Sequence, residues 1–145
     1  MRDDMTEWLK VPTRFRDLDP NNHVNNTVYF IYLEMARMNY FKKSGVLSLR
    51  DSDNKGIPVV SQTCNYRAQV FHPSTLDVGI RCEELREKTV HLAYEVYLED
   101  TDTLVADGVS ISAWVDLDTP KAIPLPEELR KAILDFDGMS STPVQ

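Results

Sequence analysis

The sequence lacks the features that would place it in a membrane or on a nucleic acid. It has no stretch of roughly 18 or more apolar residues, so no segment is predicted to span a bilayer. Its first residues carry no apolar run behind a basic head, so we expect no signal peptide. Basic residues are in the minority, with 16 Lys and Arg against 23 Asp and Glu. The resulting net charge of −7 argues against a dedicated nucleic-acid-binding protein.

Cysteine and histidine are scarce as well. Cys64 and Cys82 could form one bridge at most, and both occupy apolar positions of alternating segments, which favours buried, reduced thiols. The three histidines, His23, His72 and His91, are too dispersed to make a metal site, and there is no Cys-x-x-Cys. We therefore expect a cytoplasmic protein without a metal or other cofactor, and we expect His72 and His91 at the surface.

What remains is an ordinary globular composition, 42% hydrophobic and 27% charged. For a chain of 145 residues this predicts a single domain over residues 1–145. We expect its ordered core to run from about residue 8 to 137, followed by a disordered tail from Gly138.

Alternation of apolar and polar residues predicts the secondary structure. Period-two patterns predict strands over residues 9–17, 60–70, 76–82, 90–98 and 105–117, the last with its odd-numbered residues buried. Eleven apolar residues in sixteen predict a helix from Thr27 to Lys42, and Pro126 begins a short amphipathic helix. Polar residues predict a loop over 51–56. Short connections between the last four strands favour an antiparallel meander, and the long helix must pack on its apolar face, which is an α+β fold.

Most of the chemistry-bearing side chains lie just before the long helix. Two carboxylates, four asparagines and one histidine fall between Asp17 and Asn26. Turn formation, with Asn25 or Asn26 capping the helix, would account for this composition. Alternatively, the free N–H groups and partial positive charge of the helix N-terminus would stabilise a developing oxyanion. With Asp19 and His23 nearby, that site would suit acyl transfer, with a carboxylate as nucleophile or base.

The segment resembles the hotdog-fold acyl-CoA thioesterases, the 4-hydroxybenzoyl-CoA thioesterase-like family. The matching residues are Asp19, His23-Val24-Asn25-Asn26, Tyr29 and Glu34-x-x-Arg37. Weaker matches continue along most of the chain and include Tyr66-Arg67-Ala68, the run Leu104–Gly108 and the run Ile123–Pro126. The resemblance implies a long central helix wrapped by a five-stranded antiparallel sheet. It also implies pairing of sheets into a homodimer or homotetramer.

The resemblance also implies roles for individual residues. Asp19 would be the catalytic carboxylate, and the backbone N–H of Asn26 would polarise the thioester carbonyl. Related acyl-carrier-protein thioesterases have an Asp-x-Asn-x-His pattern in this loop, which Asp19, Asn21 and His23 match. Asn22 stands where many acyl-CoA relatives have glycine, and asparagine tolerates the positive φ that such a turn needs. We expect His23 to matter less than Asp19, because no second group completes a triad with it.

Other residues receive substrate-binding or structural roles. Asn25, Tyr29 and Tyr32 are the candidate substrate-binding residues. Like the other aromatic residues of the helix, the two tyrosines fit the core, but Tyr32 or Tyr29 could line an acyl tunnel. Asp17 is expected to cap or hydrogen-bond rather than catalyse. Glu34 and Arg37, three residues apart on the helix, are expected to form a partly buried structural ion pair.

The sequence therefore predicts an enzyme that cleaves acyl-CoA to a free acid and CoA, with Asp19 as nucleophile or general base. One alternative is an acyl-carrier-protein thioesterase, and another is a catalytically silent hotdog protein that binds acyl thioesters. A hydratase is disfavoured because the corresponding Asp-His spacing is not visible. Independently of the chemistry, apolar side chains surround the long helix on all sides, and one sheet cannot cover them. That pattern predicts a homo-oligomer.

Overall fold

The structure is a computed structural model that describes residues 2–138. Its larger elements are β1 (Glu7–Pro12), α1 (Val28–Ser44), α2 (Val46–Ser52), β3 (Val59–Tyr66), β4 (Thr75–Leu85), β5 (Thr89–Leu98), β6 (Leu104–Ala113) and α3 (Glu127–Asp137). Short elements are η1 (Arg2–Asp4), η2 (Phe15–Asp17), β2 (Lys55–Gly56), β7 (Val115–Asp116) and β8 (Lys121–Ala122). No helix in the described part of the chain is long and apolar enough to cross a membrane. The expected disordered tail from Gly138 lies, apart from Gly138 itself, outside the described residues.

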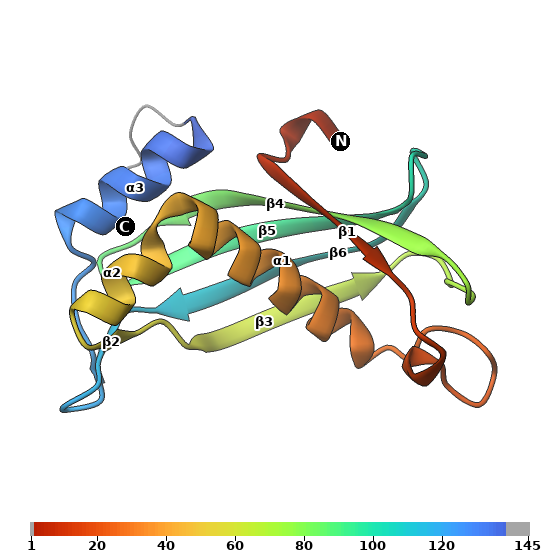
Figure 1. Ribbon diagram of the computed structural model, residues 1–145, viewed down its shortest axis with the longest axis horizontal. Helices are drawn as coiled ribbons and strands as arrows, with labels where there is room; N and C mark the ends of the chain where they lie inside the picture. Colours follow the sequence, from red (N-terminus) through yellow and green to blue (C-terminus); the bar gives the residue numbers. More distant parts are fainter. Residues whose placement is uncertain (1, 139–145) are drawn as a thin grey trace.

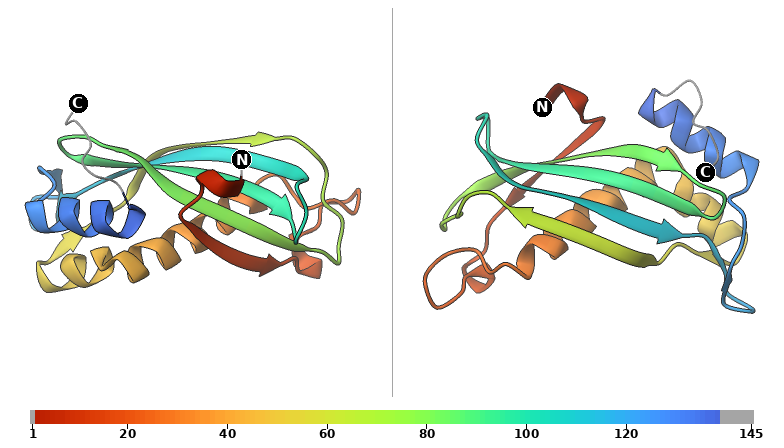
Figure 2. Two further views of the ribbon diagram at one scale, coloured as in Figure 1. Left: turned by 90° about the horizontal axis from the view of Figure 1, so that it is seen from above. Right: turned by 180° about the vertical axis from the view of Figure 1, so that it is seen from behind.

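Five strands form one antiparallel sheet in the order β1-β4-β5-β6-β3. Helix α1 lies across one face of this sheet, which curves around it (Figures 1 and 2). The inner side chains of β4 and β5 and the sheet-facing side of α1 form the core between them, with Leu33, Tyr40, Val78 and Leu92 fully buried. This is the predicted α+β hotdog arrangement, a long helix wrapped by five antiparallel strands.

The predicted meander is wrong for its first strand. β4, β5 and β6 do follow one another across the sheet, but β3 pairs with β6 at the far edge rather than with β4. Residues 67–74 therefore cross from one side of the sheet to the other. β3 is an edge strand with most of its residues exposed, including Val60 at 60%.

The predicted burial of β6 is also wrong for the middle of the strand. Its even-numbered residues face α1, because Ser110 pairs with Leu92 and Gly108 pairs with Tyr94, both of which point into the core. These inner positions carry the small residues Ala106, Gly108, Ser110 and Ser112, all of them buried. Among the odd positions, Val109 and Ile111 lie on the outer face and are half-buried, whereas Val105, beside a register shift, is fully buried in the core. Hydrophobicity alone therefore selected the wrong side for the middle of this strand.

Two further elements differ from the sequence predictions. The first strand ends at Pro12 rather than residue 17, and residues 15–17 form the 3-10 turn η2. Residues 46–52 form α2, which the sequence pattern did not predict; the loop expected over 51–56 begins inside this helix and ends in β2. Gly45, with φ of 94°, separates α1 from α2 in the left-handed conformation that glycine adopts without strain.

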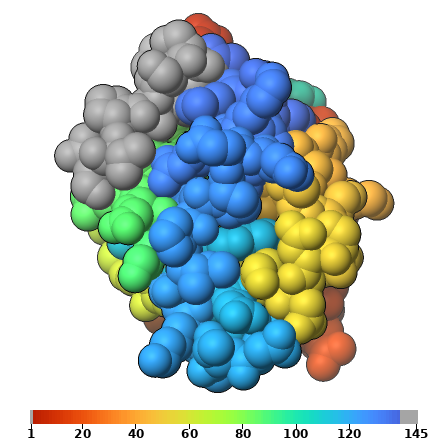
Figure 3. Space-filling model, turned by 90° about the vertical axis from the view of Figure 1, so that its left-hand side faces the viewer, coloured from red at the N-terminus to blue at the C-terminus, as the bar shows by residue number. Residues whose placement is uncertain are grey.

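Helices α2 and α3 cover the end of the molecule remote from the start of α1, as Figure 3 shows. The predicted amphipathic helix after Pro126 is confirmed, with Leu129 and Ile133 fully buried. Asp137 at its C-terminal end accepts hydrogen bonds from Thr6, Tyr40 and the backbone N–H of Cys82. One carboxylate therefore ties α3 to β1, α1 and β4.

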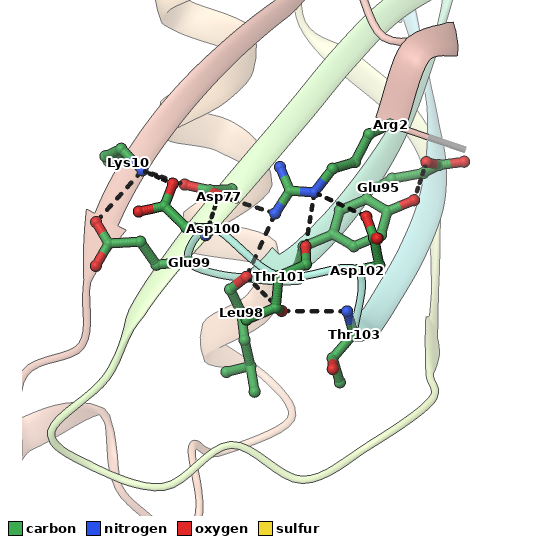
Figure 4. A network of polar contacts seen from close by, with 11 residues as sticks. Arg2, Lys10, Asp77, Glu95, Leu98, Glu99, Asp100, Thr101, Asp102 and Thr103 are labelled. Carbon is green, nitrogen blue, oxygen red and sulfur yellow. Dashed lines mark hydrogen bonds and ion pairs between the residues drawn. The ribbon is translucent and has the colours of Figure 1, made fainter.

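On the outer face, the N-terminal segment is held by Arg2 (Figure 4). Its guanidinium lies 4.9 Å from the ring centre of Trp8 and 4.5 Å from that of Tyr97. It also donates to Asp77, a carboxylate that receives a second ion pair from Lys10. Burial opposes ionisation of Asp77, but its hydrogen bonds with Lys10, the Asp100 backbone and Arg2 outweigh it and hold the pKa of this carboxyl below its usual range.

Candidate active site

The loop that carries the predicted site leaves β1, forms η2 and returns to begin α1, at the end of the molecule opposite α2 and α3 (Figure 1). Leu18 and Val24 form an antiparallel bridge across it, and His23 bridges to Phe71 in the connection between β3 and β4. The N–H of Val24 donates to the carbonyl of Val70 at 2.8 Å. The loop is therefore a hydrogen-bonded hairpin fixed against a neighbouring segment.

Asp17 stabilises this loop through hydrogen bonds of its buried side chain. Its side chain is 1% exposed and accepts hydrogen bonds from the backbone and guanidinium of Arg14 and from the hydroxyl of Tyr32 at 2.8 Å. Burial opposes its ionisation, but these bonds outweigh burial and hold the pKa of Asp17 below its usual range. The predicted hydrogen-bonding role for Asp17 is confirmed, and its carboxylate is saturated by structural contacts.

Asp19 is differently placed, partly exposed at the start of the turn. Its Oδ1 accepts the backbone N–H groups of Asn21 at 2.8 Å and His23 at 3.2 Å. Its Oδ2 has no hydrogen-bond partner among residues 2–138. Asn21 and His23 therefore hydrogen-bond to Asp19 through their backbones and not through their side chains. One carboxylate oxygen thus orders the turn and the other faces no protein donor.

Asn22 and His23 complete the turn. Asn22 has φ of 65°, so asparagine supplies the left-handed conformation expected where relatives have glycine. The ring of His23 packs edge-to-face on Phe71 at 5.0 Å between centroids, and the structure gives it no hydrogen bond to another described side chain. His23 therefore lies in the loop without the partner that a general base in a triad would need.

The backbone N–H groups at the start of α1 can be followed one by one. Asn25 donates to the carbonyl of Asp17 at 2.8 Å, Thr27 donates to Oδ1 of Asn25 at 2.9 Å, and Val28 donates to the carbonyl of Asn25. The N–H of Asn26 has no acceptor within residues 2–138. It is the free donor at the positive end of a 17-residue helix, which is the position an oxyanion would occupy.

The candidate substrate-binding residues fall into two groups. The side chain of Asn25 is already engaged, because its Oδ1 accepts both the N–H and the hydroxyl of Thr27. Tyr29 and Tyr32 are buried in the first turns of α1, with ring centroids 6.0 Å apart. Burial raises the pKa of Tyr29 to about 12 and also raises that of Tyr32, so both hydroxyls stay protonated.

Tyr32 lies on the wall of an apolar pocket between the end of β1 and α1. The pocket has a volume of about 280 Å³ and is lined by Val11, Pro12, Thr13, Arg14, Ile31, Tyr32 and Met35. It adjoins the base of the loop through Arg14 and Tyr32, both of which contact Asp17. The apolar lining is suited to a hydrocarbon group.

Several other expectations can now be compared with the structure. Glu34 and Arg37 approach to 4.0 Å, with Arg37 buried and Glu34 exposed, in agreement with a partly buried pair. His91 is buried at 7% exposure, so its predicted surface position is wrong; its ring lies between Glu84, opposite it on β4, and the hydroxyl of Thr89. Both cysteines are free, Cys82 buried and Cys64 half-buried. The described residues contain no cluster of three or more His, Cys, Asp or Glu that could hold a metal ion.

Sequence reasoning missed one residue that touches the site. Tyr66, at the end of β3, donates its hydroxyl to the carbonyl oxygen of Asn26 at 2.8 Å, and its ring contacts Tyr29. Two signals pointed to it: the weak family match at Tyr66-Arg67-Ala68, and its pairing with the buried Ala106, which places it on the face of β3 that points toward α1. A contact between residues 40 positions apart has no signature in a local pattern.

The wrapped helix and the loop with a free carboxylate oxygen and a free helix-start N–H define a hotdog-fold thioesterase. The family model of the thioesterase-like superfamily matches residues 13–133, so the chain belongs to that superfamily and is a thioester hydrolase, similar to the acyl-CoA thioesterases. It is 30% identical over 124 residues to the long-chain acyl-CoA thioesterase FadM of Escherichia coli, an alignment covering 86% of this chain and 94% of FadM.

Solved structures agree with this assignment. A thioesterase from Thermus thermophilus, crystallised with coenzyme A and zinc, superposes with a TM-score of 0.82 at 27% identity, covering 94% of this chain and 97% of that one. The PA5185 protein of Pseudomonas aeruginosa superposes with a TM-score of 0.84 at 26% identity, covering 99% and 97%.

Proposed function

We propose that the protein hydrolyses acyl-CoA to a free acid and CoA, with Asp19 as the catalytic carboxylate and the N–H of Asn26 as the oxyanion donor. The observation that carries this proposal is the pairing of two unsatisfied groups in one ordered loop, Oδ2 of Asp19 and the N–H of Asn26. The similarity to FadM, a long-chain acyl-CoA thioesterase, supports acyl-CoA as the substrate class.

Two routes fit this arrangement. As a general base, Asp19 takes a proton from water while the water oxygen attacks the thioester carbon, and the proton then passes to the departing CoA thiolate. As a nucleophile, Asp19 attacks the same carbon and releases the thiolate, and water cleaves the resulting anhydride to regenerate the carboxylate. In both routes negative charge develops on the carbonyl oxygen, where the N–H of Asn26 stabilises it. Rapid quenching followed by peptide mass spectrometry detects an acyl adduct on Asp19 only if the second route operates.

Asp19→Asn is the sharpest test, because the amide oxygen can still accept the two backbone bonds that order the turn. Thiol release from a panel of acyl-CoAs, followed with a thiol-reactive dye, should show kcat lowered by about 10²–10⁴-fold with little change in KM. Asp135→Ala, which removes an exposed carboxylate on α3, is the matched control and should leave kcat unchanged. Retention of more than about a tenth of wild-type kcat in Asp19→Asn and Asp19→Ala would exclude Asp19 as the catalytic group.

The lesser role proposed for His23 is tested in the same assay. His23→Ala should retain more activity than Asp19→Ala, since its ring has no partner to activate it. Abolished activity in His23→Ala with nearly normal Asp19→Ala would reverse the assignment. The same panel, extended to acyl-carrier-protein thioesters, separates the two substrate classes, and tight binding without turnover of either would favour a silent binding protein.

The acyl group would occupy the apolar pocket beside Tyr32, next to the base of the loop. The outer wall of this pocket is formed by Ile31 and Met35, which are 45% and 44% exposed. Asn25 and Tyr29 would then act at the start of α1, Asn25 through its turn and Tyr29 through its ring. The extent of the single domain, residues 1–145, and its cytoplasmic location both stay predictions.

We further propose a homo-oligomer built on the exposed apolar side of α1 and the edge strand β3. Ile31, Met35 and Met38 are exposed on the helix, and Val60 is exposed on β3. An exposed edge strand can pair with its own copy, and a two-fold axis makes that pairing antiparallel. The Tyr66 end of one β3, which contacts the loop, would then lie against the Val59 end of the partner. The site would thus lie at a subunit boundary.

Light scattering coupled to size exclusion tests this assembly. An interface of this kind should bury on the order of 2,000 Å² and persist at low micromolar concentration. Ile31→Lys combined with Met35→Lys should shift the protein toward monomer and lower activity. A folded, fully active wild-type monomer near 16.6 kDa would refute the proposal.

A further inference from the structure

Tyr66 contacts the loop from outside it. Its hydroxyl donates to the carbonyl oxygen of Asn26 at 2.8 Å, although Tyr66 belongs to the edge strand β3. Its ring packs edge-to-face on Tyr29, in the first turn of α1, with centroids 5.2 Å apart. The side chain is 46% exposed, so this position is not imposed by burial in the core.

The contact falls on Asn26, whose N–H has no acceptor among the described residues. The peptide group before Asn26 is held at its oxygen, because the carbonyl of Asn25 accepts the N–H of Val28 at 3.0 Å, and the N–H of Asn25 itself donates to the carbonyl of Asp17. The peptide group after it is held at its nitrogen by the side chain of Asn25, through Thr27, and at its oxygen by Tyr66. The bonds to Asp17 and Thr27 arise within the loop, whereas Tyr66 anchors it to the sheet. The two peptide groups meet at the Cα of Asn26, so removing that anchor would loosen the backbone at Asn26 and let the direction of its N–H shift.

We propose that Tyr66 is a positioning residue for thioester hydrolysis, whose hydroxyl holds the Asn26 backbone so that its N–H points at the developing oxyanion. This inference rests on the oxyanion role proposed above for Asn26. Tyr66 touches neither substrate nor reacting atoms; it acts through the backbone of Asn26. Because Tyr66 lies on β3, it also connects the strand proposed for subunit pairing to the donor that stabilises the transition state.

Tyr66→Phe removes the hydroxyl and keeps the ring on Tyr29. In the full-length protein we expect kcat for acyl-CoA to fall about tenfold with KM changed by less than about twofold, since a displaced donor weakens transition-state binding more than substrate binding. Tyr97→Phe is the matched control, because it deletes one tyrosine hydroxyl bond, to Glu95, on the outer face. It should leave kcat unchanged, and both variants should keep the melting temperature of the wild type to within a few degrees.

Binding of two non-hydrolysable CoA analogues distinguishes a positioning role of Tyr66 from a general structural role, which would not change their relative affinities. In one a methylene replaces the thioester sulfur and the carbonyl remains; in the other, a thioether, the carbonyl is absent. Tyr66→Phe should weaken binding of the ketone analogue several-fold and leave binding of the thioether analogue unchanged. Wild-type kcat in Tyr66→Phe, or equal weakening of both analogues, would overturn the proposal. If the wild-type protein hydrolyses no acyl-CoA, the proposed function fails, and the analogue comparison still decides the role of Tyr66.

Discussion

Replacing Asp17 by alanine tests whether this residue stabilises the loop, as distinct from Asp19, which is proposed to carry out the chemistry. The carboxylate of Asp17 accepts the backbone N–H of Arg14, the guanidinium of Arg14 and the hydroxyl of Tyr32, while itself 1% exposed. Asp19, two residues later, makes bonds only to backbone groups of its own turn. The same substitution at the two positions should therefore affect different properties of the protein.

The magnitude follows from the groups left unpaired. A buried polar group that loses its partner costs about 1–3 kcal/mol, and the Tyr32 hydroxyl, on a side chain only 2% exposed, carries this in full. The Arg14 N–H is only partly buried, and its guanidinium, on a side chain 57% exposed, exchanges its lost bonds for water and adds little. We therefore expect Asp17→Ala to lower the free energy of unfolding by about 2–3 kcal/mol. Against a typical total of about 5–15 kcal/mol, this is a large loss.

Urea denaturation followed by tryptophan fluorescence measures this loss as a lower midpoint with an unchanged slope. Asp19→Ala is the control and should change the free energy of unfolding by less than about 0.5 kcal/mol. The pKa of Asp17 is held below its usual range, so its stabilisation is present above about pH 4 and is lost as the pH falls through the folded-state value. The difference between wild type and Asp17→Ala should therefore shrink below about pH 4. If Asp17→Ala lowers the free energy of unfolding by less than about 0.5 kcal/mol at neutral pH, the stabilising role assigned to Asp17 is refuted.

Three further predictions follow from other parts of the fold. Asp137→Ala, which leaves Tyr40 and the N–H of Cys82 without an acceptor, should lower the free energy of unfolding by about 2–4 kcal/mol in urea, while Asp135→Ala should be nearly neutral. Burial lowers the pKa of His91, so its neutral form favours folding; wild-type stability should fall as the pH drops from about 7 to 5, and His91→Gln should lose less over that range. Gly108→Ala would place a Cβ 2.3 Å from the carbonyl oxygen of Thr63, so it should force β3 away from β6 and lower both melting temperature and activity, whereas Ala106→Gly should affect stability only mildly.

The local parts of the fold could be predicted because their causes are local. The helix over α1 follows from a run of apolar residues without Gly or Pro, and β4 and β5 follow from alternation whose apolar residues are buried in the core. The turn at Asn22 follows from the tolerance of asparagine for positive φ. In each case neighbouring residues determine the backbone directly.

The errors arise where partners distant in the chain decide the outcome. β6 carries Gly108 where a Cβ would meet the backbone of β3, and Ser110 where its hydroxyl shares a hydrogen bond with the buried Tyr94. Hydrophobic alternation cannot express either requirement. Likewise β3 reads as the first strand of a meander, although its place beside β6 depends on the crossing of residues 67–74. Helix α2 is short and follows Gly45, so it lacks the length that makes a periodic pattern visible.

The candidate site combines both kinds of information, which is why the sequence predicts its residues better than its geometry. Composition marks Asp17 and Asp19 equally, as two carboxylates before a helix. The family resemblance separates them, and the fold gives the physical reason: Asp17 is buried against Tyr32, whereas one oxygen of Asp19 has no donor among the described residues. The N–H of Asn26 is distinguished in the same way. The N–H groups of Asn25 and Thr27 on either side of it donate to Asp17 and to the side chain of Asn25, and the Asn26 carbonyl accepts from Tyr66. What distinguishes the proposed catalytic groups is therefore their lack of partners, and that property exists only in the folded chain.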